Sequence, residues 1–437
     1  MKDRIINGFS KLTKEEKISW LSNVFIEDAH EAMIELSSFW HCNEHQQRIF
    51  DGFSENTVSN FLMPYGIAPN FLIDGVVYAV PMVIEESSVV AAAAAAAKFW
   101  LERGGFKTEV RSMEKIGQVH FKWKGDFKLL QNLSSTLSQY LRDKARPHMV
   151  NMEKRGGGLL RIEFLDFTDQ CQDLYQLRAY FDTKDSMGAN FINTVLESFA
   201  TSLDDYFVET DDIPDEYKDV QIIMSILSNY TPDCTARAWV SCPIEKLGSF
   251  PNDISAQEFA EKFYTAVEIA RIDKFRATTH NKGIYNGIDA VILATGNDFR
   301  AIEAAGHTYA SRDGQYKSLS SCRIDDGVFH FELEVPLAIG TIGGLTSLHP
   351  LAKRSLQILG NPSAEQLMRI IAAVGLAQNF AAVRSLVTTG IQKGHMKMHL
   401  LNILNHLGAS EDLKNKALEY FSDKTVSFAA VREFLGM

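Results

Sequence analysis

Seven consecutive alanines, at positions 91–97, constrain the fold of this chain more than any other feature of its sequence. The run follows Ser87-Ser88 and leads to Gly104-Gly105. Serine before an apolar segment and glycine after it are typical of the two ends of a helix. Because alanine favours a helix and has a small side chain, the pattern predicts a helix over 89–103 onto which neighbouring backbone packs closely. Its uninterrupted apolar part, 89–97, is far shorter than the ~20 residues that cross a bilayer, so a buried helix is expected.

Asp-Gly pairs between two β-rich runs are a strong signal for tight hairpin turns. The sequence predicts two such hairpins, with strands at 71–73 and 76–84 around Asp74-Gly75, and at 323–324 and 328–335 around Asp326-Gly327. An amphipathic helix is expected over 256–272 and a short buried strand over 291–294.

Residues 112–220 have the pattern of a separate α/β unit. Val119, Phe121 and Trp123 alternate as in a strand, and a polar helical stretch follows to about residue 146. Two more strands are expected at 159–166 and 175–182, and then a helix from about 188 to 207. The order strand–helix–strand–strand–helix resembles a ferredoxin-like, split βαβ arrangement.

We therefore expect an α/β (α+β) fold in which a small domain interrupts a large one. The large domain comprises residues 1–111 and 221–390, and the small domain comprises residues 112–220. The acidic, turn-rich segment 210–216 favours a boundary there. The last residues, 391–437, are expected to form a helical C-terminal flap.

Composition narrows the class of protein. Lys plus Arg total 44 and Asp plus Glu total 55, so the formal net charge of -11 argues against a general nucleic-acid binder. The five cysteines are scattered without a CxxC pair, which favours a reducing compartment. No apolar signal core follows Met1. We expect a cytoplasmic protein with neither nucleic acid nor a membrane as a partner.

Several common site motifs are absent from the sequence. No GxGxxG follows a strand, and neither GxxxxGK[ST] nor GxSxG occurs. His41 and His45 are four residues apart, as are His395 and His399, but neither pair has the glutamate of an HExxH motif. Solvated or core histidines are the simpler interpretation, so no metal is expected.

Four polar stretches remain, at 85–88, 182–190, 276–283 and 295–298. By local pattern, the first is either a helix cap or a pair of acids placed for proton transfer. The second is either a turn or a helix start that binds phosphate. The last two are either surface loops or the two ends of a unit in which a lysine and an aspartate meet. The residues alone leave these alternatives open.

In order, these stretches and two later ones resemble motifs of the hydroxymethylglutaryl-CoA reductase family in its soluble bacterial form, class II. The matching segments are VPMVIEE (80–86), DSMGAN (185–190), HNKG (280–283), ATGND (294–298), VGLAQNF (374–380) and GIQKGHM (390–396). The resemblance implies a large substrate-binding domain, with 112–220 as the nicotinamide-cofactor domain.

The resemblance also implies a reaction, the reduction of 3-hydroxy-3-methylglutaryl-CoA to mevalonate and CoA by two hydrides from NAD(P)H, through a hemithioacetal and mevaldehyde, in the mevalonate pathway. Four residues match the catalytic positions of the family. In this scheme Lys282 stabilises the oxyanion, Asp298 keeps that lysine charged, Glu86 donates a proton and His395 protonates the departing CoA thiolate. Oxidation of mevalonate in the opposite direction, and a non-catalytic CoA-ligand-binding protein, are the alternatives.

Binding residues are likewise implied by the resemblance. Substrate contacts are expected from Ser88, Arg276, Asn281, Gln378 and Lys11, and cofactor contacts from Asp185, Ser186, Met187, Gly188 and Asn190. Arg146 and His148 lie where the ribose contact is expected, and the lack of an acid over 144–150 favours NADPH while leaving NADH open. The implied partners are hydroxymethylglutaryl-CoA, mevalonate and CoA, in a homodimer or a higher assembly of dimers.

Overall fold

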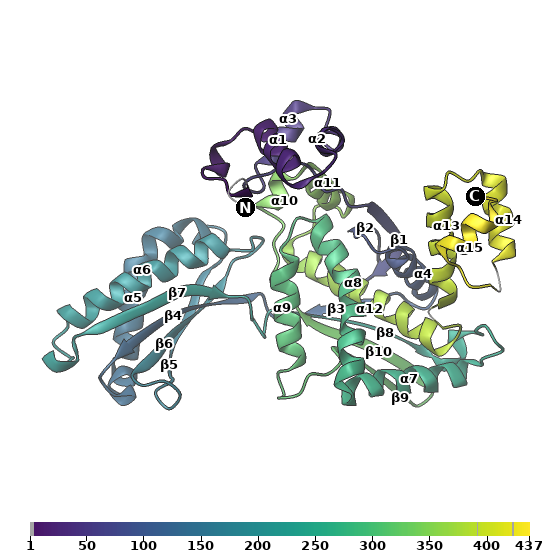
Figure 1. Cartoon of the computed structure of the whole chain (residues 1–437). Helices are drawn as coiled ribbons and strands as arrows, with labels where there is room; N and C mark the ends of the chain where they lie inside the picture. The colour runs from purple at the N-terminus through teal and green to yellow at the C-terminus, as the bar shows by residue number, and fades with distance from the viewer. Residues whose placement is uncertain (1–3, 391, 422–423) are drawn as a thin grey trace.

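The computed structural model describes residues 4–390, 392–421 and 424–437, and over 392–398 it describes only the backbone. Figure 1 shows a central α/β body with a smaller α/β unit on one side and the C-terminal helices on the other. The N-terminal helices lie above the central body in the same view. Mixed helix and sheet are therefore present, as the sequence predicts.

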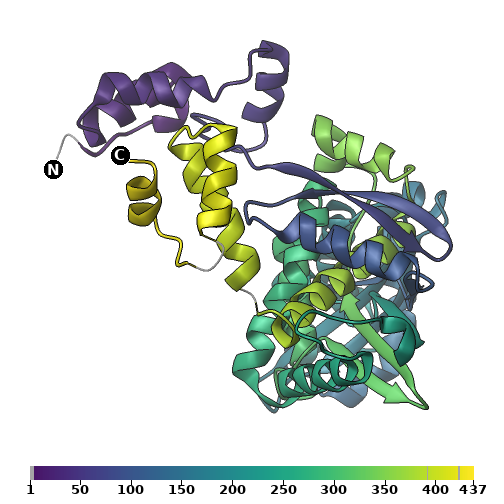
Figure 2. The ribbon, with the colours of Figure 1, turned by 90° about the vertical axis from the view of Figure 1, so that its right-hand side faces the viewer.

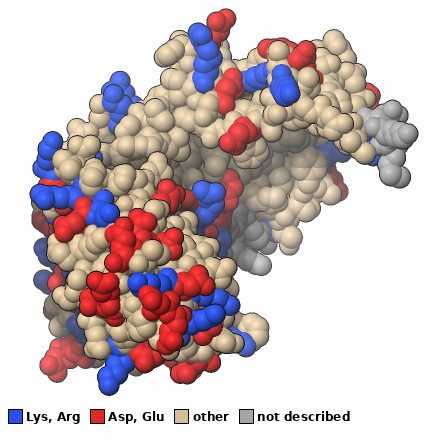
Figure 3. Space-filling view, turned by 90° about the vertical axis from the view of Figure 1, so that its left-hand side faces the viewer, with Lys and Arg blue, Asp and Glu red and all other residues tan. Residues whose placement is uncertain are grey.

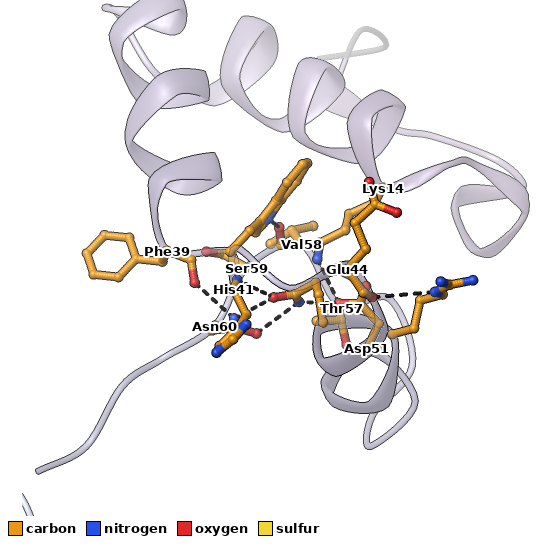
Figure 4. Close-up of polar contacts among 12 residues, drawn as sticks. Lys14, Phe39, His41, Glu44, Asp51, Thr57, Val58, Ser59 and Asn60 are labelled. Atoms are coloured by element: carbon orange, nitrogen blue, oxygen red, sulfur yellow. Dashed lines mark hydrogen bonds and ion pairs between the residues drawn. The ribbon is translucent and has the colours of Figure 1, made fainter.

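A polar network joins the N-terminal helices to one another and to the segment that follows them. After a short 3-10 helix, η2, the chain forms three helices, with bounds η2 Phe9–Lys11, α1 Lys14–Phe25, α2 Ala29–Ser38 and α3 Glu44–Asp51. In Figure 4, Lys14 Nζ lies 2.7 Å from Asp51 Oδ1, and the Asn60 side chain donates to the Phe39 carbonyl at 2.9 Å. These bonds hold the segment that leads into the first strand.

The first hairpin and the alanine-rich helix are confirmed. Strands β1 (Tyr65–Ile73) and β2 (Val76–Val83) pair antiparallel, and Asp74 and Gly75 both adopt positive φ in the turn. Helix α4 (Val89–Leu101) packs against β1 and α12 (Ala364–Val387), with Ala93, Ala96 and Ala97 buried. Small side chains thus allow the close contact that the sequence predicts.

A four-stranded antiparallel sheet forms the middle of the central body. Its strand order is β3-β8-β10-β9, and the predicted second hairpin is β9–β10. The strand bounds are β3 Lys107–Val110, β8 Thr235–Pro243, β9 Ser320–Asp325 and β10 Val328–Pro336. Helices pack against this sheet, with bounds α7 Ala256–Ile272, α9 Phe299–Ala310 and α12 Ala364–Val387. Two short helices connect β10 to α12, with bounds α10 Leu345–Leu348 and α11 Pro350–Ile358.

The strand expected over 291–294 is wrong, because these residues form the last turn of helix α8 (Lys274–Ala294). Val291, Ile292 and Ala294 are buried in the central core. A short apolar run has the same sequence pattern in a buried strand and at a buried helix end, so the local sequence does not distinguish the two. Helix α8 packs against α12, β2 and α7, and this long-range packing is not visible in the local pattern.

The smaller unit has the βαββαβ order of a ferredoxin-like arrangement. Its element bounds are β4 Glu114–Trp123, α5 Phe127–Glu153, β5 Gly158–Asp166, β6 Leu174–Asp182, α6 Ala189–Glu209 and β7 Val220–Ser228. The antiparallel sheet has the order β5-β6-β4-β7, and α5 and α6 pack against each other. Its buried side chains form a hydrophobic cluster separate from the central core. On the face shown in Figure 3, acidic and basic side chains are interspersed.

Helix α12 runs through the central core. By length and hydropathy it is the one helix of the described residues that is apolar enough to cross a membrane. It instead packs against α4, α7, α8 and β8, and most of its side chains are buried inside the protein. Its apolar composition therefore reflects a position in the protein core.

The chain ends in three helices, as expected for the C-terminal segment. Their bounds are α13 Gln392–His406, α14 Glu411–Tyr420 and α15 Phe428–Phe434. They contact one another around a small hydrophobic cluster that includes Leu404, Ala417 and Val431. Figure 2 shows them projecting from the same side of the central body as the N-terminal helices.

Candidate active site

Helix α8 carries four polar side chains of interest, Arg276, His280, Lys282 and Asn286. Asp273 caps the start of the helix, and its side chain accepts a hydrogen bond from the backbone of Phe275 at 3.0 Å. Residues four apart lie on one face of a helix, so Arg276 and His280 form one pair and Lys282 and Asn286 another. The HNKG stretch is therefore part of a rigid helix and is not a surface loop.

A cavity of about 270 Å³ opens between α8, the start of α4 and α12, and we call it the α8 cavity. Its lining includes Glu86, Ser88, Arg276, Lys282, Asn286 and Gln378. Gly287 allows α8 and α12 to approach, because a Cβ at this position would lie 2.8 Å from Gln378 Cβ. Three segments that are distant in the sequence thus meet at one cavity.

Glu86 and Lys282 form an ion pair in the α8 cavity. Lys282 Nζ lies 2.7 Å from Glu86 Oε2, and Asn286 Nδ2 donates to the same oxygen at 3.3 Å. The lysine side chain is 61% exposed and the glutamate 35%, so both groups are within reach of a ligand. Because Glu86 bonds α8, it makes no cap contact with α4, and the proton-transfer alternative for the 85–88 stretch gains support over capping.

Two buried oxygens on residues that line this cavity have no hydrogen-bond partner among the described residues. They are Ser88 Oγ and Gln378 Oε1. Ser88 was expected as a helix cap, but its side chain makes no cap bond and its φ is +77°. Buried polar atoms are nearly always paired, so two unpaired oxygens on residues that line one cavity are candidates for completion by a ligand.

A chain of hydrogen bonds orients Arg276. Ser320 Oγ donates to Asn379 Oδ1 at 2.7 Å and lies 2.7 Å from His280 Nε2. The hydroxyl has only one proton, so it accepts from Nε2–H, and His280 Nδ1 remains free to accept from Arg276 Nη2 at 3.5 Å. Burial, together with the Arg276 charge, lowers the pKa of His280 to about 3. The imidazole therefore stays neutral and holds the guanidinium toward the cavity.

A second, larger cavity of about 780 Å³ lies at the start of α6, and we call it the α6 cavity. Its lining includes Arg155, Met187, Gly188, Asn190, Asp298 and Gly343. Gly188 opens α6 with a φ of +83° and provides no side-chain cap for the first-turn N–H groups. A helix start with unsatisfied N–H groups beside a cation fits a phosphate-bearing ligand.

The 183–188 segment, which we call the cofactor loop because the sequence resemblance predicts cofactor contacts there, is docked onto the central body. The Asp185 carbonyl accepts from Thr341 N at 2.8 Å, and its carboxylate accepts from Ala364 N, at the start of α12, at 2.7 Å. Gly340 is needed at this contact, since a Cβ there would lie 2.4 Å from Met187 N. The loop thus belongs to the smaller unit and contacts the central body.

Asp298 lines the α6 cavity and is the cap residue that precedes helix α9. Its carboxylate accepts from the backbone N–H groups of Arg300 and Ala301, and it pairs with the Arg300 guanidinium at 3.0 Å. Partial burial alone would raise the pKa of Asp298, but these hydrogen bonds outweigh burial and lower it. The carboxylate is therefore held in its charged form.

Asp298 and Lys282 do not meet within this chain. Lys282 lies twelve residues before the end of α8, which is about 18 Å along the helix axis. Asp298 lies just beyond that end, and it lines a different cavity from Lys282. In one chain, the predicted contact between the two residues is replaced by the Glu86–Lys282 and Asp298–Arg300 pairs.

Several other residues named by the sequence lie outside the two cavities. Asn281 is fully buried, and its amide bonds the backbone of Lys317 and Leu319. Arg146 and His148 are exposed on α5 and line neither cavity. Lys11 is exposed in η2. His395 belongs to α13, but its side chain lies outside the described residues.

The structure adds three residues to which the sequence assigned no role. Asn286 contacts Glu86, and His280 orients Arg276. Arg155 follows the end of α5 and lines the α6 cavity. Spacing alone contained a signal for Asn286, which lies one helical turn after Lys282. Among the residues that the structure describes, no group of three or more His, Cys, Asp or Glu side chains is placed to hold a metal ion.

Comparison with known proteins identifies a family. Residues 15–400 match the family model described as hydroxymethylglutaryl-coenzyme A reductase. The chain is 39% identical over 425 residues to 3-hydroxy-3-methylglutaryl-coenzyme A reductase of Archaeoglobus fulgidus, covering 95% of this chain and 90% of the relative. It is 34% identical over 380 residues to a probable enzyme of the same name from Borreliella burgdorferi, covering 86% and 83%.

Solved structures give a similar result. The 3-hydroxy-3-methylglutaryl-coenzyme A reductase from Streptococcus pneumoniae superposes with a TM-score of 0.72 at 37% identity, covering 98% of this chain and 99% of that chain. A class II structure from the same organism, described as bound to NADPH in open conformations, gives a TM-score of 0.71 at 36% identity, covering 94% and 99%.

Proposed function

The chain belongs to the hydroxymethylglutaryl-coenzyme A reductase family of oxidoreductases, and we propose that the α8 cavity is where it binds and reduces the hydroxymethylglutaryl thioester. One observation carries this assignment. An ammonium and a carboxyl group lie 2.7 Å apart in a cavity that also holds an oriented arginine and two unpartnered oxygens. The relatives are named as reductases, so the degradative direction and a non-catalytic binding role are not favoured.

Each cavity residue has a task that its chemistry suits. Arg276 binds the free carboxylate of the hydroxymethylglutaryl group, because its planar fork matches two carboxylate oxygens. Ser88 and Gln378 hydrogen-bond the substrate and so satisfy their buried oxygens. Lys282 lies where it can stabilise the oxyanion that forms when the thioester carbonyl is reduced. Glu86, in contact with that lysine, donates the proton from its protonated form, in which it accepts a hydrogen bond from Lys282 and no longer forms an ion pair with it.

We place the cofactor at the α6 cavity. A nicotinamide cofactor supplies the hydrides. The unsatisfied N–H groups at the start of α6 would hold its phosphates, and Asp185, Ser186, Met187 and Asn190 would shape the loop around them. Arg155 is a cation in the same cavity and suits a 2′-phosphate, which favours NADPH over NADH. A solved class II relative is described as bound to NADPH.

We propose that the working enzyme is a dimer whose site combines the α8 cavity of one chain with Asp298 of the other. The separation of about 18 Å along α8 motivates this arrangement, since Asp298 can support Lys282 only from a second copy. His395, at the start of the C-terminal helices, would protonate the CoA thiolate as it departs. The five free cysteines accord with a reducing, cytoplasmic location.

The function is tested by following nicotinamide absorbance with purified protein. We expect oxidation of NADPH that depends on hydroxymethylglutaryl-CoA and releases CoA thiol and mevalonate. Acetyl-CoA serves as the control thioester, because it lacks the carboxylate that Arg276 is proposed to bind. Equal rates with both thioesters, or no thioester-dependent oxidation with either cofactor, would contradict the proposal.

A further inference from the structure

Lys115 is a buried lysine that the proposed reaction does not use. It is the second residue of β4 and is 4% exposed. Its Nζ donates to Thr183 Oγ1 at 2.5 Å and to the Ser186 carbonyl at 2.9 Å. Asp182 lies nearby but pairs with Lys184 at 2.7 Å. The ammonium of Lys115 therefore donates its hydrogen bonds to neutral oxygens of the cofactor loop.

A buried ammonium in this position requires an explanation. Removing a charged group from water is costly, and an apolar side chain of similar length would fill the same space without that cost. Burial lowers the pKa of Lys115, although Cys234, Asp182 and Asp185 act in the opposite direction. Both hydrogen bonds of Lys115 go to the cofactor loop. The charge of the lysine is therefore expected to serve the structure or the ligand of that loop.

The cofactor loop separates Lys115 from the α6 cavity. A smaller cavity of about 290 Å³ is lined by Lys115, Met187, Ala189 and Asp298. Met187 and Ala189 also line the α6 cavity, whereas Lys115 does not. The ammonium thus lies behind the loop, at the place where the smaller unit contacts the central body.

Hydrogen bonds inside the loop make Lys115 its central support. Thr183 Oγ1 accepts from Lys115 and donates to the Ser186 carbonyl at 2.7 Å, so one hydroxyl joins both ends of the turn. Ser186 Oγ in turn donates to the Thr183 carbonyl at 3.0 Å. Gly188 packs directly on Thr183, and α6 starts with the next residue. A shift of the ammonium would therefore move the start of α6.

We propose that Lys115 is a positioning residue that holds the cofactor loop in its phosphate-binding form and adds positive charge behind the start of α6. The ligand class is a dinucleotide with a negatively charged pyrophosphate. This inference rests on the proposed function, which assigns the loop to the cofactor. Lys115 touches neither the cofactor nor the reacting atoms and acts through the loop.

The test is the affinity of the full-length protein for NADPH after Lys115→Met, measured by calorimetry. Methionine fills the space of the lysine without its charge or its donors. We expect the Kd for NADPH to rise roughly tenfold or more, as for loss of charge-assisted hydrogen bonds. The KM for the thioester should change much less, and the melting temperature should not fall. Lys122→Met is the matched control, since Lys122 is an exposed residue of the same strand.

A pH profile separates positioning from a purely structural role. The pKa of Lys115 is lowered, so the amine loses its proton earlier in the alkaline range than an exposed lysine does. NADPH affinity of the wild type should therefore fall as pH rises, and Lys115→Met should lack this fall. The other titratable groups that face this space are Asp182, Asp185, Asp298 and Cys234. Burial raises the pKa of the Cys234 thiol to about 11, so its ionisation comes later.

Two further variants make the result decisive. Thr183→Val keeps the shape of the loop but removes the acceptor hydroxyl, and it should weaken NADPH binding in the same direction if Lys115→Met does not fold. Asn190→Ala tests the loop assignment itself. If Asn190→Ala weakens NADPH binding while Lys115→Met and Thr183→Val bind like the wild type, the Lys115 proposal is wrong and the proposed function stands. If none of the three affects binding, the cofactor site is misplaced.

Discussion

Replacement of Glu86 by glutamine isolates proton donation from folding. The glutamine side chain has the same shape and keeps an oxygen that can accept from Asn286 Nδ2, now 3.3 Å from Glu86 Oε2. It cannot release a proton at the active site. Glu85 is the matched control, because it precedes Glu86 directly and is exposed.

The structure gives different magnitudes for stability and for turnover. The Glu86–Lys282 pair is 35% and 61% exposed, so solvent screens it and its loss should cost no more than about 1 kcal/mol of unfolding free energy. Loss of a general acid instead lowers the rate by about 10²- to 10⁴-fold, which corresponds to about 3–5 kcal/mol in the activation barrier. Glu86→Gln should therefore fold normally and turn over poorly.

The assay combines steady-state NADPH oxidation with urea unfolding for Glu86→Gln, Glu85→Gln and the wild type. We expect kcat to fall by about a hundredfold or more for Glu86→Gln and to stay within about twofold of the wild-type value for Glu85→Gln. The two variants should have similar unfolding midpoints. If they have similar turnover as well, Glu86 is not the proton donor and the reasoning from the ion pair is refuted.

Four other outcomes are expected. Lys282→Ala and Asp298→Ala should each lose ~3 kcal/mol or more of transition-state stabilisation. When the two variant chains are co-expressed, the mixed dimers should regain part of the activity. If no activity is regained, both residues act in the site of one chain. His395→Gln should depress thioester reduction and spare reduction of added mevaldehyde, which involves no thiolate, and equal losses would contradict the proposed role. Arg155→Ala should lower kcat/KM for NADPH about tenfold and leave NADH little changed, and a parallel loss would exclude a 2′-phosphate contact. The pKa of His280 is lowered to about 3 in the folded state, so as pH falls the unfolded chain binds the imidazole proton before the folded chain does. The free energy of unfolding should therefore drop by about 2 kcal/mol between pH 6.5 and pH 5. The urea midpoint of His280→Gln should depend less on pH than that of the wild type.

Local patterns predict the two hairpins and the alanine-rich helix because the deciding signals are short. The Asp74-Gly75 and Asp326-Gly327 turns and the alanine-rich helix all form where expected. The strand expected over 291–294 fails for the opposite reason, since only long-range packing decides between helix and strand for four apolar residues, and α8 packs against α12, β2 and α7.

The candidate site is less accessible to sequence reasoning, because long-range packing selects among neighbouring residues of the same type. Asn281 and Asn286 are both on α8, but of the two only Asn286 lines the cavity. The side chain of Asn281 instead hydrogen-bonds the backbone of residues 317 and 319. Helix α5 continues past Pro147 to Glu153 and leaves Arg146 and His148 exposed. Arg155 therefore takes the place in the cavity that was expected for them.

Helix α12 also limits where insertions and deletions can be tolerated in this protein. Its first N–H group bonds Asp185 of the cofactor loop, and Gln378 lines the α8 cavity fourteen residues later, about 21 Å along the axis. One inserted residue would translate the later part by about 1.5 Å and rotate it by about 100°, turning Gln378 away from the cavity. Point substitutions on the surface of this helix leave that spacing intact. Insertions and deletions between 364 and 378 should therefore be selected against even where every new side chain is apolar.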